Sequence, residues 1–282
     1  MIQQLAADHP VQTLCQLLGV SRSGYYQWCQ RVPGPRAQAR AQLLPEVRRV
    51  FVQSRQTYGS PRVTRALRAA GHTCNHKQVE RLMRAAGLQG RPPKRWRVVT
   101  TDSRHDLPIA PNRLAQQPVC TAPDQVWLTD ITYVPTGEGW LYVAGLLDLY
   151  SRRIVGWAMG ESLATVLPLT ALLMALKHRR PPAGLLHHSD RGVQFASADY
   201  RRQLVDHGIV ASMSRKGNCY DNAAMESFWS TLKHELVYRC QFLTRDQARQ
   251  AIFEWIEVFY NRTRLHSSLG FQSPVDFEKQ LN

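Results

Sequence analysis

Three carboxylates have the residue type and spacing of a metal site. Asp130 ends the apolar run "QVWLTD", Asp190 ends "GLLHHSD", and Glu226 stands near the start of a predicted helix, with 35 residues between Asp190 and Glu226. Carboxylates without clustered thiols favour Mg²⁺ or Mn²⁺ over zinc. Two such ions, about 3.5–4 Å apart, stabilise the attacking and leaving oxygens of an in-line phosphoryl displacement. The pattern therefore predicts a two-metal site.

Each acid alone has an ordinary structural interpretation. Asp130 could end a strand, Asp190 could form an Asx turn, and Glu226 could be a first-turn acid favoured by the helix dipole. Their combination is what indicates catalysis. Lys233 follows Glu226 by seven residues, about 700° of helix rotation, so both lie on one face. We interpret Lys233 as a contact to a DNA phosphate, the alternative being a solvated helix charge.

The elements that must position these residues begin near residue 124. The runs "QVWLTDITYVP", "GWLYVAGLLDLYS" and "RRIVGWAMG" predict three antiparallel strands. A helix is expected over about 165–178, with Thr170, Leu173 and Leu176 toward the core. A fourth strand "GLLHHSD", a helix over 197–207 and a fifth strand "IVASMS" follow.

This order predicts an α/β fold: a ribonuclease-H-like five-stranded mixed sheet with flanking helices, preceded by an all-α helix-turn-helix region. The first and fourth strands are neighbours in that topology, so Asp130 and Asp190 can meet at one metal. Glu226 follows a loop, "RKGNCYDN", and is expected to swing toward a second metal.

Several other polar residues of this region receive structural interpretations. His187 and His188 are expected to pack within their strand, and Asp148 to be a structural acid pairing with Arg152 or Arg153. A helix is predicted over 245–261 with an apolar face. The segment "YNRTRLHSSLG" at its end is expected to pack on the core, and its candidate phosphate contacts are Arg262, Arg264 and His266.

Positive charge is concentrated in the first third of the chain. The whole sequence carries a formal net charge of +15, and residues 1–97 hold 17 Lys/Arg against 3 Asp/Glu. Residues 98–282 hold 19 Lys/Arg against 18 Asp/Glu. A nearly neutral body with a basic arm is typical of a protein that binds nucleic acid.

Residues 9–29 are predicted to form helix, turn and helix, with Gly19 breaking the first helix and Ser21 capping the second. In a helix-turn-helix, Arg22 and Tyr25 would face DNA, whereas a plain helical hairpin fits the pattern equally well.

A second helical unit follows. One helix is expected over 44–56, with Pro45 in its first turn. Ser60 and Pro61 predict the capped start of the next helix. Asn75 is expected to cap a third, whose outward cations we interpret as DNA contacts: Lys77, Arg81 and Arg84. A helical hairpin without DNA is the alternative.

The predicted domains are an N-terminal helix-turn-helix-like segment (1–35), a helix-turn-helix DNA-binding region (36–90), a basic linker (91–122) and the catalytic core with its C-terminal helix and tail (123–282). The linker is rich in proline, and its cations, among them Arg95 and Arg97, are expected to follow a phosphate backbone. The six cysteines lack paired short spacing, and the sequence has neither a signal peptide nor an apolar run of about 18 residues. We therefore expect a cytoplasmic protein without membrane contact.

Four motifs, "TDITYV", "HSDRGVQF", "KGNCYDNAAMESFWSTLKHE" and "YNRTRLHSSLGFQSP", resemble bacterial insertion-sequence transposases encoded in two overlapping frames. The chain is similar to the second-frame protein, and its catalytic part resembles retroviral integrases. The resemblance implies that Asp130, Asp190 and Glu226 bind the metals, and that cleavage at element ends frees a 3′-hydroxyl that attacks another phosphodiester.

The resemblance also implies an upstream-frame protein or frameshift fusion as partner, and pairing of two element ends implies at least a dimer on DNA. The partners would be terminal repeats and target DNA. Two alternatives remain: a nuclease of the same fold that only hydrolyses, and a non-catalytic DNA-binding regulator derived from a transposase.

Overall fold

The computed structural model describes residues 1–32, 34–90, 107–116, 119–215 and 222–281. Its centre is a five-stranded sheet of order β3-β2-β1-β4-β5. The first three strands are antiparallel, and β4 and β5 join in parallel. The strands are β1 (Val126–Thr136), β2 (Gly139–Asp148), β3 (Ile154–Gly160), β4 (Leu186–Ser189) and β5 (Val210–Met213).

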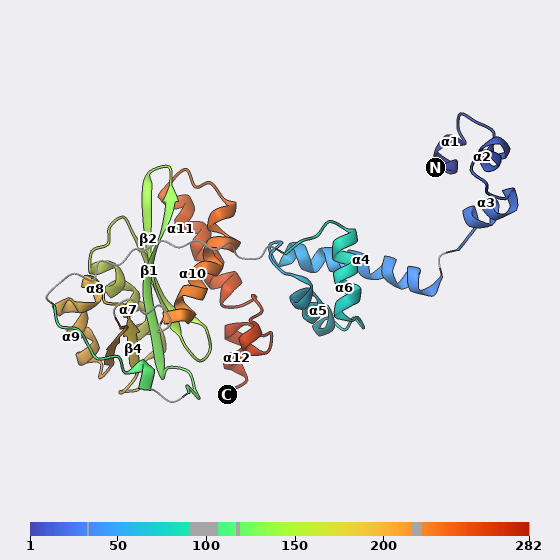
Figure 1. Ribbon diagram of the computed structural model, residues 1–282. Coiled ribbons are helices and arrows are strands. Elements are labelled where there is room, and N and C mark those ends of the chain that lie inside the picture. Colours follow the sequence, from blue (N-terminus) through green and yellow to red (C-terminus); the bar gives the residue numbers. More distant parts are fainter. Residues whose placement is uncertain (33, 91–106, 117–118, 216–221, 282) are drawn as a thin grey trace.

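Helices cover both faces of the sheet, as Figure 1 shows. On one side lie α7 (Val166–Arg179), α8 (Val193–Ala196) and α9 (Ala198–Asp206), and on the other α10 (Ala223–Glu235) and α11 (Arg245–Glu254). A separate apolar core fills each side. The predicted fold class is confirmed, as is the prediction that the first and fourth strands are neighbours.

The buried face of α7 differs from the prediction. Thr170 is exposed and Leu173 is 45% exposed, whereas Leu176 is buried as expected. Small residues face the sheet instead: a Cβ on Gly156 of β3 would lie 2.3 Å from the Ala171 carbonyl oxygen. Helix and strand approach closely there, so Ala171 and Ala175 face β3, and Leu173 is left on the exposed side.

The helical region consists of α4 (Pro35–Gln53), α5 (Ser60–Ala69) and α6 (His76–Ala85). The predicted start of the first helix at 44 was wrong, and Pro45 lies inside α4. Pro35 occupies the first turn instead, where its missing N–H costs nothing. The alanine-rich segment after it has high helix propensity and carries the helix through Pro45.

The pair α5 and α6 largely follows the sequence pattern. The Asn75 side chain accepts a hydrogen bond from the Gln78 amide, 2.8 Å, as the predicted cap of α6. At α5, Ser60 is the first helical residue and does not cap it, because its hydroxyl bonds His76 Nε2 at 2.9 Å.

The N-terminal segment contains α1 (Ile2–Leu5), α2 (Val11–Leu17) and α3 (Arg22–Cys29). Figure 1 shows it at the far end of α4 from the sheet. The Ser21 cap is confirmed, since its hydroxyl accepts from the Gly24 amide at 3.1 Å. The prediction that Tyr25 faces DNA was wrong: the ring is 9% exposed and stacks on Trp28, because this small segment needs it as core.

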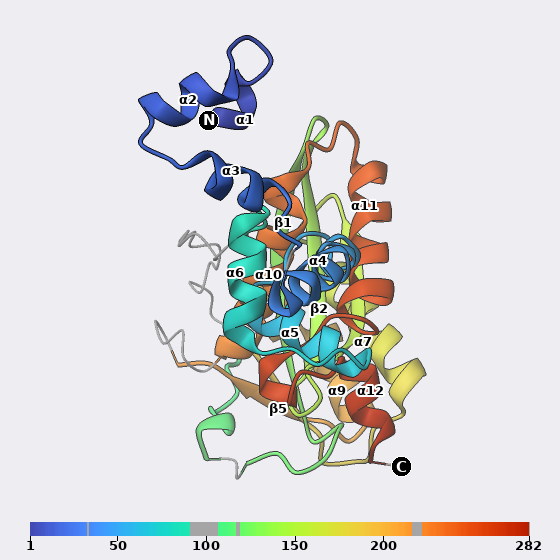
Figure 2. The ribbon, with the colours of Figure 1, turned by 90° about the vertical axis from the view of Figure 1, so that its right-hand side faces the viewer.

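The loop after α4 anchors the helical region on the C-terminal part of the chain. Arg55 forms an ion pair with Glu254 and lies over the Phe259 ring, 5.3 Å from its centroid. The Tyr58 hydroxyl accepts from the Leu265 amide at 2.7 Å. Figure 2 shows α4, α5 and α6 in front of the sheet and its helices in this view. The residues on both sides share one apolar core.

Beyond α11 the chain continues helically, as predicted for 245–261. It forms the π-helical turn η4 (Trp255–Tyr260), in which Val258 is exposed and the other apolar residues are buried. Shorter elements complete the fold: η1 (Leu114–Gln116), η3 (Val237–Arg239), η5 (Ser267–Leu269) and α12 (Pro274–Lys279). Ahead of η1, the Arg113 amide donates to Ser212 Oγ at 3.0 Å, so part of the predicted linker packs on β5.

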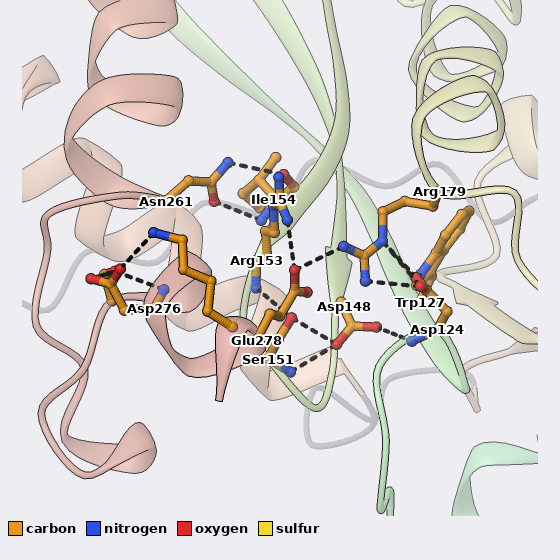
Figure 3. A network of polar contacts seen from close by, with 12 residues as sticks. Asp124, Trp127, Asp148, Ser151, Arg153, Ile154, Arg179, Asn261, Asp276 and Glu278 are labelled. Atoms are coloured by element: carbon orange, nitrogen blue, oxygen red, sulfur yellow. Dashed lines mark hydrogen bonds and ion pairs between the residues drawn. The ribbon is translucent and has the colours of Figure 1, made fainter. Parts of the chain in front are cut away.

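A polar network ties α12 to the ends of β1, β2 and α7 (Figure 3). Asp148 is buried and structural, but the expected arginine pairing was wrong. Its carboxylate accepts hydrogen bonds from the Asp124 amide at 2.7 Å and from the backbone amide and the hydroxyl of Ser151. Arg153 pairs with Glu278 at 2.6 Å instead, because the short turn after β2 brings the Ser151 amide and hydroxyl to the carboxylate first.

Candidate active site

The parallel pairing of β1 and β4 brings two of the three carboxylates together. Leu128 lies opposite His188 in the ladder, and the same register carried two residues further sets Asp130 opposite Asp190. Residues two apart on a strand share a face of the sheet. Both acids are half-buried. The register therefore supports the prediction that the two aspartates meet. The prediction that Asp130 ends its strand was wrong, because β1 continues to Thr136.

Backbone amides hold both carboxylates. Asp130 Oδ1 accepts from the Ile131 amide at 2.8 Å, and Asp190 Oδ1 accepts from the Gly192 amide at 2.9 Å. A Cβ on Gly192 would lie 3.0 Å from Asp190 Oδ1. Gly192, in the turn after β4, thus avoids a steric clash with the Asp190 carboxylate.

Helix α10 packs closely over this pair because β2 has a glycine opposite Asp130. A Cβ on Gly145 would lie 2.9 Å from Met225 Cε and 3.0 Å from the Trp229 indole. The buried Asn222 side chain donates to the Thr129 carbonyl at 3.3 Å and fixes the start of the helix next to Asp130. Glu226, in the first turn of α10, is exposed.

Electrostatics distinguish the three acids. Burial, then the Asp190 carboxylate and more weakly Glu226, raise the pKa of Asp130 to about 8, against smaller opposing effects of the Ile131 amide and the Trp229 indole. Burial alone raises the pKa of Glu226. A neighbouring positive charge would therefore stabilise the ionised form of Asp130.

Lys233 reaches the same region from two turns further along α10. Its ammonium lies 5.0 Å from the centroid of the Tyr133 ring on β1. Burial lowers the pKa of Lys233, and the Asp130 charge opposes that shift. The predicted shared face of Glu226 and Lys233 thus lies toward Asp130.

The donors fit a hard divalent cation, since they are carboxylate oxygens. Within the described residues, no group of three or more His, Cys, Asp or Glu is gathered closely enough to hold a metal ion. Asp130 and Asp190 meet, whereas Glu226 stands apart from them on α10. In that same part of the chain, Trp229 Nε1 and Asn222 Oδ1 are buried without a hydrogen-bond partner.

Sequence reasoning missed Trp229 and Gly145 as parts of this site. Trp229 follows Glu226 by three residues and so lies on nearly the same helix face, which was a usable signal. Gly145 had none, because its role depends on which strand lies beside β1 and which helix covers it.

The two histidines before Asp190 pack in the sheet, as predicted. His187 is buried, its Nε2 lies 2.9 Å from the Tyr200 hydroxyl, and burial lowers its pKa to about 3. His188 lies between two hydroxyls, 2.9 Å from Ser212 and 3.0 Å from Ser214.

The C-terminal segment also packs on the core, as predicted. Arg264 is 5% exposed and forms a two-pronged pair with Glu235, so Arg264 is not a free surface cation for DNA. His266 is buried as well, whereas Arg262 is exposed.

The expected DNA contacts of the helices lie on the surface. Lys77, Arg81 and Arg84 are exposed on α6, and Arg22 is exposed on α3. Arg84 also pairs with Glu80 at 2.9 Å. Arg95 and Arg97 lie outside the described residues. No helix in the described part of the chain is long and apolar enough to span a membrane.

Together the sheet, the paired aspartates and the helix-borne glutamate define an enzyme class: the chain is a polynucleotidyl transferase of the DDE type. Family models agree, with "Integrase core domain" matching residues 121–219 and 207–274 and "HTH-like domain" matching 38–96.

Curated relatives match almost end to end. The "Insertion element IS600 uncharacterized 31 kDa protein" of Shigella sonnei is 48% identical, covering 95% of this chain and 98% of the relative. "Transposase InsF for insertion sequence IS3A" of Escherichia coli (strain K12) is 41% identical, covering 99% and 97%. The chain belongs to this family of insertion-sequence transposases.

Solved structures include a simian T-cell lymphotropic virus intasome in complex with PP2A regulatory subunit B56 gamma, at 14% identity and TM-score 0.49 over 81% of this chain and 73% of that one. Another is the HTLV-2 integrase catalytic core domain in complex with magnesium, at 15% identity and TM-score 0.43 over 56% and 98%.

Proposed function

We propose that this transposase cleaves the ends of its insertion sequence and transfers the freed 3′-hydroxyl strand to target DNA, using Asp130, Asp190 and Glu226 with two Mg²⁺ or Mn²⁺ ions. The observation that carries the proposal is the β1–β4 register, which sets Asp130 opposite Asp190 beside the start of the helix that bears Glu226.

Each residue has a distinct part. Asp130 and Asp190 would hold one ion, and the burial and the neighbouring Asp190 charge that raise the pKa of Asp130 are what a bound cation would offset. Glu226, in the first turn of α10, would supply the ligand for the second ion. The ions, when bound, stabilise the attacking and leaving oxygens.

Lys233 binds the phosphate beside the scissile bond, because it lies on the Glu226 side of α10 within range of Asp130. Lys77, Arg81 and Arg84 on α6 contact the DNA backbone, as do Arg22 on α3 and the linker cations Arg95 and Arg97. The helical segments 1–35 and 36–90 and the linker 91–122 bind DNA for the core 123–282. The active form is at least a dimer on DNA, with an upstream-frame protein or frameshift fusion as partner.

The test is strand transfer with pre-cleaved element-end DNA and Mg²⁺, by the chain together with its upstream frame. Wild type is expected to give joined product, and Glu226→Gln to bind the same DNA without joining it. Hydrolysis without joining would indicate a nuclease, and normal joining by Glu226→Gln would refute the assigned glutamate.

A further inference from the structure

A second cavity lies on another side of α10, between that helix, α5 and the C-terminal segment. Its volume is about 600 Å³, and no carboxylate is among the described residues that line it. Its cations come from three separate elements: Arg62 of α5, Arg152 of the β2–β3 turn and Arg264 after η4. Its apolar lining includes Leu128, Leu147 and Phe228.

The three guanidinium groups converge on one imidazole. His266 also lines the cavity, and burial, followed by Arg264, Arg62 and Arg152, lowers its pKa to about 2. Arg264 has its charge matched by Glu235. Arg62 lies over the Tyr58 ring, 5.6 Å from its centroid, and neither its guanidinium nor that of Arg152 bonds another described side chain. Glu235 also attracts Arg62 and is thus shared with Arg264, so three guanidinium groups face one carboxylate and a net positive charge remains here.

His266 supplies an independent sign of a ligand. The residue is 8% exposed, and its Nε2 has no hydrogen-bond partner in the described part of the chain. The ring donates to the Tyr260 backbone carbonyl. A neutral imidazole that donates through one nitrogen accepts through the other. A buried acceptor without a donor is destabilising, and a ligand N–H or O–H would supply the missing hydrogen bond.

We propose that this cavity binds one nucleotide of a DNA strand, with its phosphate between Arg62 and Arg152 and a base N–H on His266 Nε2. The volume is in the range of small-molecule sites, about 300–1,000 Å³. Every base carries an N–H donor, and the leucines suit its faces. Ser227 of α10 lines the cavity next to Glu226, so a strand leaving the carboxylates can cross the helix into it. The proposal deepens the transposase function above and rests on it.

The test measures binding of a fluorescein-labelled dT dodecamer, and of the same backbone with abasic residues, to the full-length chain in EDTA. Wild type should bind the abasic strand about tenfold more weakly. Arg62→Gln with Arg152→Gln should weaken dT binding about tenfold and remove that difference. Its salt slope should fall by about 0.7, the contribution of the one single-stranded phosphate that the two arginines share.

The control is Arg48→Gln with Arg65→Gln, which removes the same charge from exposed positions on α4 and α5 outside the cavity. It should keep the difference between the two probes. Ser268→Trp, which fills the cavity from its exposed rim, should abolish the difference without removing charge.

Equal binding of both probes by wild type, or equal losses in the two double variants, would overturn the nucleotide site. Displacement of the dodecamer by dTMP, at concentrations where inorganic phosphate has no effect, would assign the cavity to free nucleotides instead. Because no metal is present, a probe difference in a chain that fails strand transfer would refute the proposed function and not the pocket.

Discussion

The sheet half and the helix half of the active site are built differently. Asp130 and Asp190 are half-buried, fixed by a strand register and each held by a backbone amide. Glu226 is exposed, at the start of a helix fixed by Asn222 and by packing against Gly145. The two aspartates are thus held in place although burial and their mutual repulsion disfavour their charges. The position of Glu226 depends instead on the position of α10.

Asp130→Asn should have the largest effect on activity. Losing a carboxylate of the preorganised pair removes the position where the first cation binds, so strand transfer should fall by about 10³-fold or more. The folded chain should remain, because the amide keeps the shape. Activity within tenfold of wild type in a Mg²⁺ assay would show that the sheet pair is not the metal site.

The same pair predicts an unusual pH dependence of stability. A folded-state pKa of about 8 for Asp130, against about 3.9 unfolded, means that the native state binds the extra proton between those values. Stability without metal should therefore be highest below pH 4 with respect to this group and fall as pH rises to about 8. Thermal melts in EDTA at pH 5 and pH 8 measure it.

Asp130→Asn should remove that pH dependence and raise the Tm at pH 8, by about 2–4 °C for each kcal/mol relieved. Glu226→Gln is the matched control from the helix half and should change the slope much less. If the two variants gave the same melting curves, the contrast between the halves would fail.

Gly145→Ala should act through the helix half. The added Cβ meets Met225 and Trp229, so α10 must shift or its side chains must turn, moving Glu226 with it. We expect about tenfold slower strand transfer with DNA affinity unchanged. Gly71→Ala is the control. Nothing lies near a Cβ at Gly71, but its φ is positive. This variant should therefore lower stability and leave the rate per folded molecule unchanged.

Lys233→Gln should give the smallest effect, about three- to tenfold weaker use of DNA, because one phosphate contact is lost and the carboxylates stay in place. When KM and kcat are measured separately, KM for DNA should rise and kcat should stay unchanged. A loss confined to kcat would assign Lys233 to the reacting atoms instead.

The same contrast explains what the sequence could and could not predict. Asp130 and Asp190 were recognisable because each follows an apolar run, although only Asp190 stands at the end of a strand. The buried face of α7 could not be predicted, because Ala171 and Ala175 face the sheet where Gly156 allows the helix to approach closely. The exposure of Tyr25 was wrongly predicted because its small segment uses this aromatic ring as core. The start of α4 was wrongly predicted because the helix contains two prolines, Pro35 and Pro45. The misses at α7 and Tyr25 depended on tertiary neighbours, whereas the miss at α4 was a local choice between two prolines.

The most direct test of the two-metal account counts Mn²⁺ bound to the chain on pre-cleaved end DNA, by electron paramagnetic resonance. Wild type should bind two ions in the site, Glu226→Gln one, and Asp130→Asn none. Two ions retained by Asp130→Asn would contradict the account.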